Sequence, residues 1–384
     1  MAMLSRKCWL RFRAIGGSLS LKSLVNLSTA TTLKAPNQNA DVVDYLVNSL
    51  GFSKDAAITT ISKVPRLRPS PEKANSVVNY LQNLGVNKSH IRNMVSGHPS
   101  LLVCRVDKTL EPKFKYLREL GLSGSDLVKV ILGYKFVWRL ALDTEIKSRV
   151  LYLRQLVGTD DNVLTVLKRY SRVLGCCDTE LVESNLKLLR NYGISEDNIV
   201  KLIVRRPRRI FATKPEEMEE ILHKVERVLR IPRQSAATFH YGVEVIFSFN
   251  ESNIDEKLEV FRSFGWSDAE IFKMVKMLPP VLRVSSPRIR EVLDYFMNEL
   301  GYSSDYLASR PIFLTYSFDN RVKPRNEVLR ILCEKKLNNS KAGLFTVLAL
   351  PEPRFLKNFI LPYKDILPDI CEAYLSKTKT PKSK

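Results

Sequence analysis

The chain has 384 residues, 45% of them hydrophobic, and its 61 lysines and arginines outnumber 40 acidic residues to give a net charge of +21. This excess makes a polyanion the expected partner, with nucleic acid and an anionic membrane as candidates and a merely solvated basic surface as the alternative. No apolar run approaches the roughly 18 residues of a membrane-spanning helix. The six cysteines and four histidines lack the spacing of a zinc site. We therefore expect neither a membrane protein nor a metal site.

Residues 1–40 have the composition of a targeting segment. They hold six basic residues and no aspartate or glutamate, and serine and threonine are dense from Ser18 to Thr32. An acid-free segment rich in arginine and serine, with an amphipathic start at Leu4 to Ile15, is typical of an organelle transit peptide, and a disordered basic arm is the alternative. The early arginines favour a mitochondrial address, and the second half leaves a chloroplast address open. Without this segment the chain still carries about +15.

From residue 41 onward the chain repeats with a period of about 36 residues. Apolar-periodic stretches end at glycines 34 to 37 residues apart, except for one gap of 72 with an empty slot near Leu229: Gly51, Gly85, Gly121, Gly158, Gly193, Gly265 and Gly301. Glycine readily adopts the left-handed conformation that ends a helix, so each marks the end of a first helix. Two residues later comes a predicted N-cap for a second helix, at Ser53, Asn87, Ser123, Ser195, Ser267 and Ser303. Glu270 completes a predicted capping box with Ser267.

The second helix of each unit has a stop signal of its own. A proline disfavours helical geometry in the residue before it. Prolines recur in one slot, which other repeats fill with Lys135, Ser171 and Val243: Pro65, Pro99, Pro207, Pro279 and Pro311. Three residues later lies an apolar anchor, replaced in the first repeat by Arg68: Leu102, Trp138, Leu174, Ile210, Ile246, Leu282 and Leu314. We expect a short 3₁₀ turn to place each anchor against the core.

These marks predict an all-α superhelical solenoid of helix-helix-3₁₀ repeats, because each unit can bury its apolar face only against its neighbours. The predicted organisation is a transit peptide over 1–40, about eight repeats and a degenerate ninth over 41–375, and a basic tail over 376–384. Repeats three, four and six lack the proline. Repeat six also lacks the glycine and carries Pro232 where a helix cap is expected. The middle of the solenoid is therefore expected to be less regular.

The pattern resembles the mitochondrial transcription termination factor (mTERF) family, as in LGFSKDAAITTISKVP at 50–65 and GISEDNIVKLIVRRPRRI at 193–210. The stretch FLKNFILPYKDILPDICEAY at 355–374 looks like the closing element of that family, so the resemblance covers about 41–375. Many repeats behind a transit peptide are typical of its plant-type organellar members. The resemblance implies a left-handed superhelix with a basic concave groove. It also implies a nucleic-acid-binding regulator of organellar gene expression, acting in transcription termination, RNA processing or intron splicing.

Basic residues gather at one corner of the repeat, around the proline slot. The densest cluster is Arg205, Arg206, Arg208 and Arg209 beside Pro207, and comparable positions hold Arg139, Arg169, Arg172, Arg283 and Arg310. One cation at a helix C-terminus can simply complement the helix dipole, but four arginines in five positions repel one another without a counter-charge. We therefore predict that these nine arginines contact the phosphates of a nucleic acid. Tyr134 and Tyr170 beside them serve either packing or base stacking.

The sequence holds no signature of catalysis. No phosphate loop, dinucleotide-binding glycine pattern, zinc-protease motif or nucleophile elbow occurs in it. We therefore predict no enzymatic activity and no cofactor. The expected partner is double-stranded DNA, organellar RNA or both, bound by a monomer. The alternative is a protein-binding scaffold in an organelle, and a steep loss of affinity with salt separates nucleic-acid binding from it.

Overall fold

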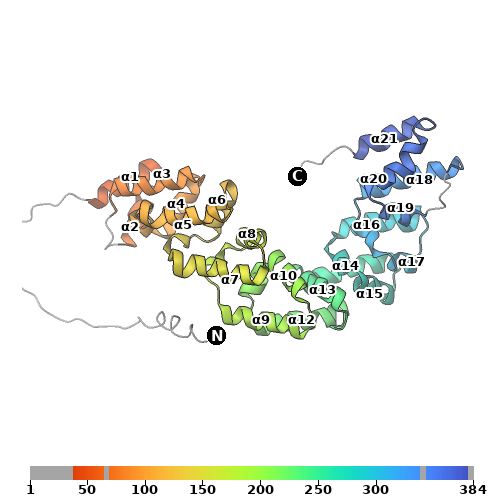
Figure 1. The fold of residues 1–384 in the computed structure, drawn as a ribbon, viewed down its shortest axis with the longest axis horizontal. Helices are drawn as coiled ribbons and strands as arrows, with labels where there is room; N and C mark the ends of the chain where they lie inside the picture. Colours follow the sequence, from red (N-terminus) through yellow and green to blue (C-terminus); the bar gives the residue numbers. More distant parts are fainter. Residues whose placement is uncertain (1–37, 65–68, 338–342, 379–384) are drawn as a thin grey trace, which may run out of the picture.

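The helices of successive repeats stack side by side along one curved array (Figure 1). The computed structural model describes residues 38–64, 69–337 and 343–378, and within them every regular element is an α, 3₁₀ or π helix. This confirms the predicted all-α solenoid. Residues 1–37 of the predicted transit peptide, Pro65, Arg68 and residues 379–384 of the predicted basic tail lie outside the described residues.

Nine helix pairs form the array in the described part of the chain. The first helices are α1 (Gln38–Leu50), α3 (Pro71–Asn83), α5 (Glu111–Glu119), α7 (Ser148–Val157), α9 (Thr179–Asn191), α12 (Pro215–Leu229), α14 (Glu251–Ser263), α16 (Ser286–Leu293) and α18 (Lys323–Glu334). The second helices are α2 (Lys54–Ser62), α4 (Lys88–Gly97), α6 (Gly124–Gly133), α8 (Asp160–Arg169), α10 (Glu196–Arg205), α13 (Ala236–Ser248), α15 (Asp268–Met277), α17 (Ser304–Ala308) and α19 (Leu344–Ala349). Four first helices are extended by a π-helical turn, namely η2 (Val106–Leu110), η4 (Leu142–Lys147), η7 (Asp294–Glu299) and η9 (Phe318–Val322). The array closes with α20 (Glu352–Phe355), η10 (Leu356–Ile360), η11 (Leu361–Tyr363) and α21 (Pro368–Thr378).

A short third element follows the second helix in six repeats, as the proline slot predicts. These elements are η1 (Pro99–Val103), η3 (Val137–Arg139), η5 (Ser171–Leu174), α11 (Pro207–Ala212), η6 (Pro279–Arg283) and η8 (Pro311–Thr315). All are 3₁₀ turns except α11, which is a 6-residue α-helix. The seven predicted anchors are all buried, with no more than 7% of any of them exposed. The third element therefore does what the sequence pattern predicts, and drives an apolar side chain into the core.

Repeat six departs from this plan. The predicted stop at Val243 is wrong, because α13 runs without a break over 13 residues, from Ala236 to Ser248. Valine keeps its backbone N–H and places no ring against the preceding turn, so it permits the helix to continue. The lack of a proline does not by itself cause this, because α6 and α8 also end before a slot that holds no proline, at Gly133 and Arg169. The anchor Ile246 is still buried, now inside the last turn of α13.

The left-handed positions keep the period even where glycine is missing. All seven predicted glycines have positive φ, between 69° and 112°. The empty slot near Leu229 is filled by Arg230 at φ 52°, and Lys336 at φ 56° ends the first helix of the ninth repeat. A side chain in this conformation costs roughly 1–2 kcal/mol. The backbone turn is therefore retained at two positions where the sequence no longer favours it.

All six predicted residues stand at the N-cap of their helix, and three of them form the expected side-chain hydrogen bond. The side chains of Ser53, Asn87 and Ser267 accept a backbone N–H of the following helix, and Ser267 forms the full capping box with Glu270. Ser123, Ser195 and Ser303 occupy the N-cap with an extended backbone, but the expected hydrogen bond from their side chains to the helix is absent. Helix α8, for which the pattern predicts no cap, has Thr159 as its N-cap, and the Thr159 side chain accepts from Asn162 N.

A polar side chain inside the core ties the first helix to the third element in four repeats. The donors are Lys113 Nζ to Trp138 O (2.5 Å), Arg149 Nη1 to Leu174 O, Asn185 Nδ2 to Ile210 O (3.0 Å) and Lys257 Nζ to Val284 O (2.6 Å). The first three are 36 residues apart and the fourth is 72 further on. Each side chain donates a hydrogen bond to a backbone carbonyl near the end of a short helix. The last carbonyls of a helix have no N–H partner within that helix, so the side chain supplies one. Burial lowers the pKa of Lys113 and Lys257, because an ammonium is poorly solvated there.

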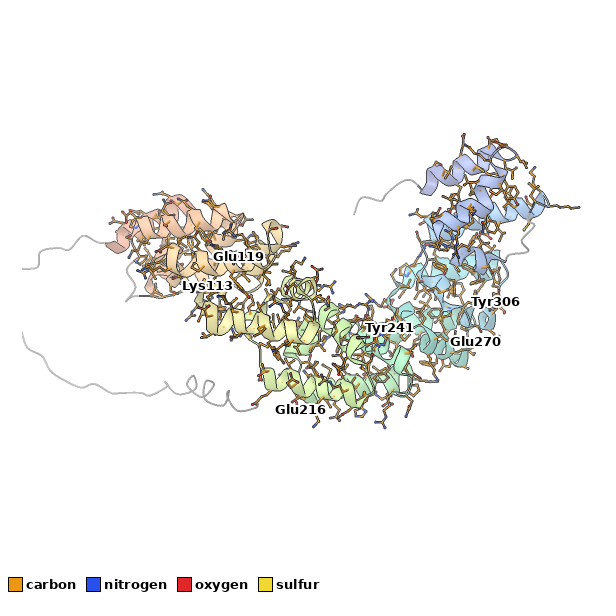
Figure 2. The ribbon with its side chains drawn as sticks, viewed as in Figure 1. Lys113, Glu119, Glu216, Tyr241, Glu270 and Tyr306 are labelled. Carbon is orange, nitrogen blue, oxygen red and sulfur yellow. The ribbon has the colours of Figure 1, made fainter. Side chains whose placement is uncertain are left out.

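The array bends into an arch. Figure 1 shows the first helices α9 and α12 on the outer side of the bend and the second helices α8 and α10 on its inner side. Figure 2 places Glu216, at the start of α12, on the outer side. The C-terminal ends of the second helices, where the predicted arginines gather, therefore belong to the layer that lines the arch.

Candidate nucleic-acid interface

The corner at Pro207 is formed by an amphipathic helix that a proline stops. Helix α10 buries Ile199, Leu202 and Ile203 against its neighbours. Proline cannot continue that helix, so Arg206 takes a non-helical conformation (φ −135°, ψ 53°) and Pro207 opens α11. Arg205 thus sits on the last turn of α10, and two further arginines sit on the first turn of α11. The change of direction spreads four guanidinium groups around a single corner.

These arginines line a cleft that crosses several repeats, here called the arginine cleft. Its volume is about 960 Å³, and its lining is Arg169, Arg205, Arg206, Pro207, Arg208, Arg209, Ala212, Thr213, Glu217, Glu244, Phe247 and Arg283. Six of the nine predicted arginines therefore meet in one place, from repeats four, five and seven. Two glutamates, Glu217 and Glu244, also line the cleft, so the net charge of the lining is +4. A concave surface of one sign concentrates the field and attracts a polyanion.

The end of helix α13 supplies most of the partners of these arginines. Arg205 Nη1 donates to Glu244 Oε1 at 2.7 Å, and Arg283 Nη1 donates to Glu244 Oε2 at 3.4 Å. Arg206 Nη2 donates to Ser248 Oγ at 2.8 Å and Arg209 Nη2 to Phe247 O at 3.0 Å. The assumption that the cluster lacks a counter-charge is therefore wrong in part, because a buried carboxylate and the carbonyl end of a helix face it.

Arg169, Arg208 and Arg209 also line the cleft, and Arg209 has a second partner besides Phe247 O. Arg169 Nη1 donates to Val204 O at 3.0 Å, so it spans from repeat four to repeat five. Arg209 lies 3.7 Å from the exposed carboxylate of Glu217, on α12. Arg208 is exposed on α11. An exposed ion pair contributes little to stability, so the contact of Arg209 with Glu217 can be exchanged for a ligand at small cost.

Arg139 and Arg172 lie in a second, smaller pocket on repeats three and four. Its volume is about 460 Å³, and its lining is Leu132, Gly133, Tyr134, Lys135, Phe136, Arg139, Arg172 and Cys176. Arg139 lies 6.0 Å from the ring centroid of Phe136. Tyr134 is half-buried, and burial raises the pKa of its phenol. Of the two predicted tyrosines only Tyr134 lines a pocket, while Tyr170 is half-buried outside both.

Arg310 is not part of either pocket. Its guanidinium lies 3.8 Å from the ring centroid of Tyr306 and donates to the backbone oxygen of that residue at 3.3 Å. Figure 2 shows Tyr306 on the C-terminal arm of the arch, whereas Tyr241 of α13 lies at the bend. The structure therefore brings eight of the nine predicted arginines into two pockets and leaves the ninth apart.

Glu244 is the functional candidate that the sequence reasoning missed. It lies 36 residues after Arg208 and 72 after Arg172, in the same register of the repeat. The sequence does show that one repeat carries a glutamate at the position where two others carry an arginine, and this exception could have identified Glu244. The direction in which the Glu244 side chain points could not be predicted from the sequence, because it depends on α13 continuing past Val243.

Neither a metal cluster nor a membrane-spanning helix occurs in the described part of the chain. No three His, Cys, Asp or Glu side chains are grouped there so that they could hold a metal ion. Among the same residues no helix combines the length and the apolar character needed to span a membrane. The described cysteines Cys104, Cys176, Cys177, Cys333 and Cys371 form no disulfide.

Comparison with known proteins matches the mTERF family model over residues 43–356. The chain is similar to the Arabidopsis thaliana proteins "Transcription termination factor MTEF18, mitochondrial" (23% identity over 103 residues) and "Transcription termination factor MTERF15, mitochondrial" (23% over 156 residues). It is also similar to "Transcription termination factor MTERF8, chloroplastic" from the same plant, with 26% identity over 87 residues. These matches cover 27%, 41% and 23% of this chain and 18%, 32% and 17% of the respective relatives. The chain belongs to the mTERF family, whose members are non-enzymatic proteins that generally bind nucleic acid in organelles.

Proposed function

We propose that this chain is a nucleic-acid-binding regulator of organellar gene expression, and that the arginine cleft holds the phosphates of its DNA or RNA. The observation that carries this proposal is the convergence of six arginines from three repeats in one cleft of about 960 Å³. A guanidinium presents a rigid fork of N–H donors that fits two oxygens of a phosphate. Several such forks along a curved surface can follow a nucleic-acid backbone.

The exposure of the arginines supports a binding role over a purely structural one. The side chains of Arg205 and Arg283 remain 46% exposed although each contacts Glu244. An arginine has five N–H donors, and each of these two is bonded to Glu244 through one nitrogen, Nη1. The remaining donors are available to a ligand. A cluster that only stabilised the fold would have no need to leave them at a cleft.

The subcellular localisation of the chain and its step in gene expression are proposed from the relatives. Two of the three carry a mitochondrial name and one a chloroplastic name, and all three are named as transcription termination factors. We place this chain in the mitochondrion, with the chloroplast as the alternative, and assign residues 1–40 as its transit peptide. Its role is in transcription termination or in RNA processing and splicing. Crosslinking the tagged protein in organelles and sequencing the recovered nucleic acid separates these roles.

Binding measured against salt tests the proposal. A labelled mixed-sequence DNA duplex and a labelled single-stranded RNA are each titrated with the protein lacking residues 1–37. Log affinity should fall with log salt by about 0.9 per phosphate contact for the duplex and about 0.7 for the single strand. A folded protein that binds neither probe at low salt would refute the proposal and favour a protein-binding scaffold.

A matched pair of variants tests the site. Changing Arg205, Arg206, Arg208 and Arg209 together to Gln should weaken binding on the order of tenfold or more and lower the salt slope by roughly two to four. The control changes Lys115, Lys187, Arg227 and Arg290 to Gln, which are four exposed cations on the first helices α5, α9, α12 and α16. Both variants lose the same charge. Equal effects of the two would show that bulk charge acts and that the arginine cleft has no special role.

A further inference from the structure

Glu244 is a buried acid in the middle of a cationic cleft. Only 2% of it is exposed, and its two carboxylate oxygens accept from Arg205 at 2.7 Å and from Arg283 at 3.4 Å. Burying a carboxylate is costly unless it is paired. At this position the acid also repels any polyanion that enters the cleft. A surface selected only for positive charge would not keep it.

The position of Glu244 in the repeat explains how it reaches both arginines. It lies 39 residues after Arg205 and 39 residues before Arg283, so one carboxylate from repeat six joins an arginine of repeat five to one of repeat seven. This reach depends on the uninterrupted helix α13, which carries the side chain past the slot where other repeats break. The departure of repeat six from the pattern is therefore what places the acid between the two arginines.

We propose that Glu244 is a positioning residue, which fixes Arg205 and Arg283 so that their remaining N–H groups converge on one backbone phosphate. This inference rests on the proposed function, because it assigns a role within nucleic-acid binding. Long arginine side chains lose conformational freedom when they grip a ligand, and a partner that orders them beforehand removes that loss from the binding step. The carboxylate takes one nitrogen of each guanidinium and leaves the outward donors to the phosphate.

Glu244→Gln separates positioning from simple electrostatics, since the two predict opposite signs. The variant keeps the side chain shape and removes a negative charge, so electrostatics alone predicts tighter binding. Positioning predicts weaker binding, by about threefold to tenfold, for the labelled DNA duplex and RNA defined above. The control is Glu217→Gln, the other acid of the cleft, whose side chain is 58% exposed and 3.7 Å from Arg209. The control should tighten binding. Unchanged or tighter binding by Glu244→Gln overturns the inference.

A second background excludes a merely structural effect. In a protein that already carries Arg205→Gln and Arg283→Gln, Glu244 has nothing to position, so Glu244→Gln should now tighten binding. Weakening of the same size in both backgrounds overturns the inference. If thermal unfolding shows that Glu244→Gln does not fold, Glu244→Asp takes its place. This variant keeps the charge, withdraws the carboxylate by one methylene and should show the same loss, so wild-type affinity in it would contradict positioning.

Failure of this inference is distinct from failure of the proposed function. If the unaltered protein binds neither probe, nucleic-acid binding itself is refuted. If it binds and Glu244→Gln binds equally well, the proposed function stands and only the role of Glu244 is lost.

Discussion

Replacing Asn185 with leucine removes a donor that holds the arginine corner in place. Asn185 on α9 is fully buried, and its Nδ2 donates to Ile210 O at 3.0 Å and to Thr213 O at 2.9 Å. These two carbonyls lie in α11 and just after it, the element that carries Arg208 and Arg209. Leucine has a similar volume, so the substitution tests the hydrogen bonds with little change in packing.

The expected loss follows from counting the groups left without a partner. Each buried carbonyl that loses its donor costs about 1–3 kcal/mol. Part of this is offset, because leucine buries more apolar surface and because Asn185 Oδ1 has no hydrogen-bond partner among the described residues. We expect the free energy of unfolding to fall by about 2–4 kcal/mol. Nucleic-acid affinity should fall as well, since α11 is no longer fixed.

Urea unfolding followed by circular dichroism measures the change, and the repeat itself supplies the control. Lysine performs the same task in the same slot at Lys113 and Lys257, so Asn185→Lys should retain stability to within about 1 kcal/mol of the unaltered protein. The apolar residue of this slot in repeat six, Ile221, is consistent with the idea, because that repeat has no third element to tether. A stable Asn185→Leu, or an Asn185→Lys as unstable as the leucine variant, would refute the reasoning.

Two further predictions concern single positions. Lys336→Gly should raise the free energy of unfolding by about 0.5–1 kcal/mol in the same urea assay, because Lys336 has φ 56° and glycine adopts this conformation without strain; a loss of stability would contradict this. Burial raises the pKa of the Cys104 and Cys177 thiols to about 11, so at pH 8 only about one in a thousand is ionised. Iodoacetamide followed by peptide mass mapping should therefore label exposed Cys176 well before its neighbour Cys177, and equal rates would show that the buried thiol is accessible.

The fold could be predicted because its marks are local and repeated. A glycine that ends a helix, a proline that stops one and an apolar anchor each act within a few residues, and each recurs about every 36 residues. The same logic located the slot of Arg230, although no glycine marks it. The tether slot was missed because Lys113, Arg149 and Asn185 share a position but no residue type. Their common property is a donor facing the core, and that appears only when the third element is in place.

The candidate site could be predicted only in part, since its arginines are read from the sequence and their partners are not. The cluster around Pro207 is visible in the chain, and six arginines do meet in one cleft. Which of them converge depends on where in its repeat each arginine stands and on which helix packs beside it. Arg283, four residues after Pro279, joins the arginine cleft, whereas Arg310, directly before Pro311, packs on Tyr306. The local pattern around one proline does not show which helix of the next repeat packs beside it.

The least regular repeat is the one that completes the arginine cleft. Repeat six lacks both the glycine and the proline of the pattern. Positions where a sequence departs from its local structural pattern are often functional sites. In this repeat α13 continues through the slot, and Glu244, Phe247 and Ser248 on it accept hydrogen bonds from the arginines of repeat five. The irregularity therefore belongs to the arginine cleft, and under the proposed function the break in the period marks where along the solenoid the nucleic acid is expected to bind.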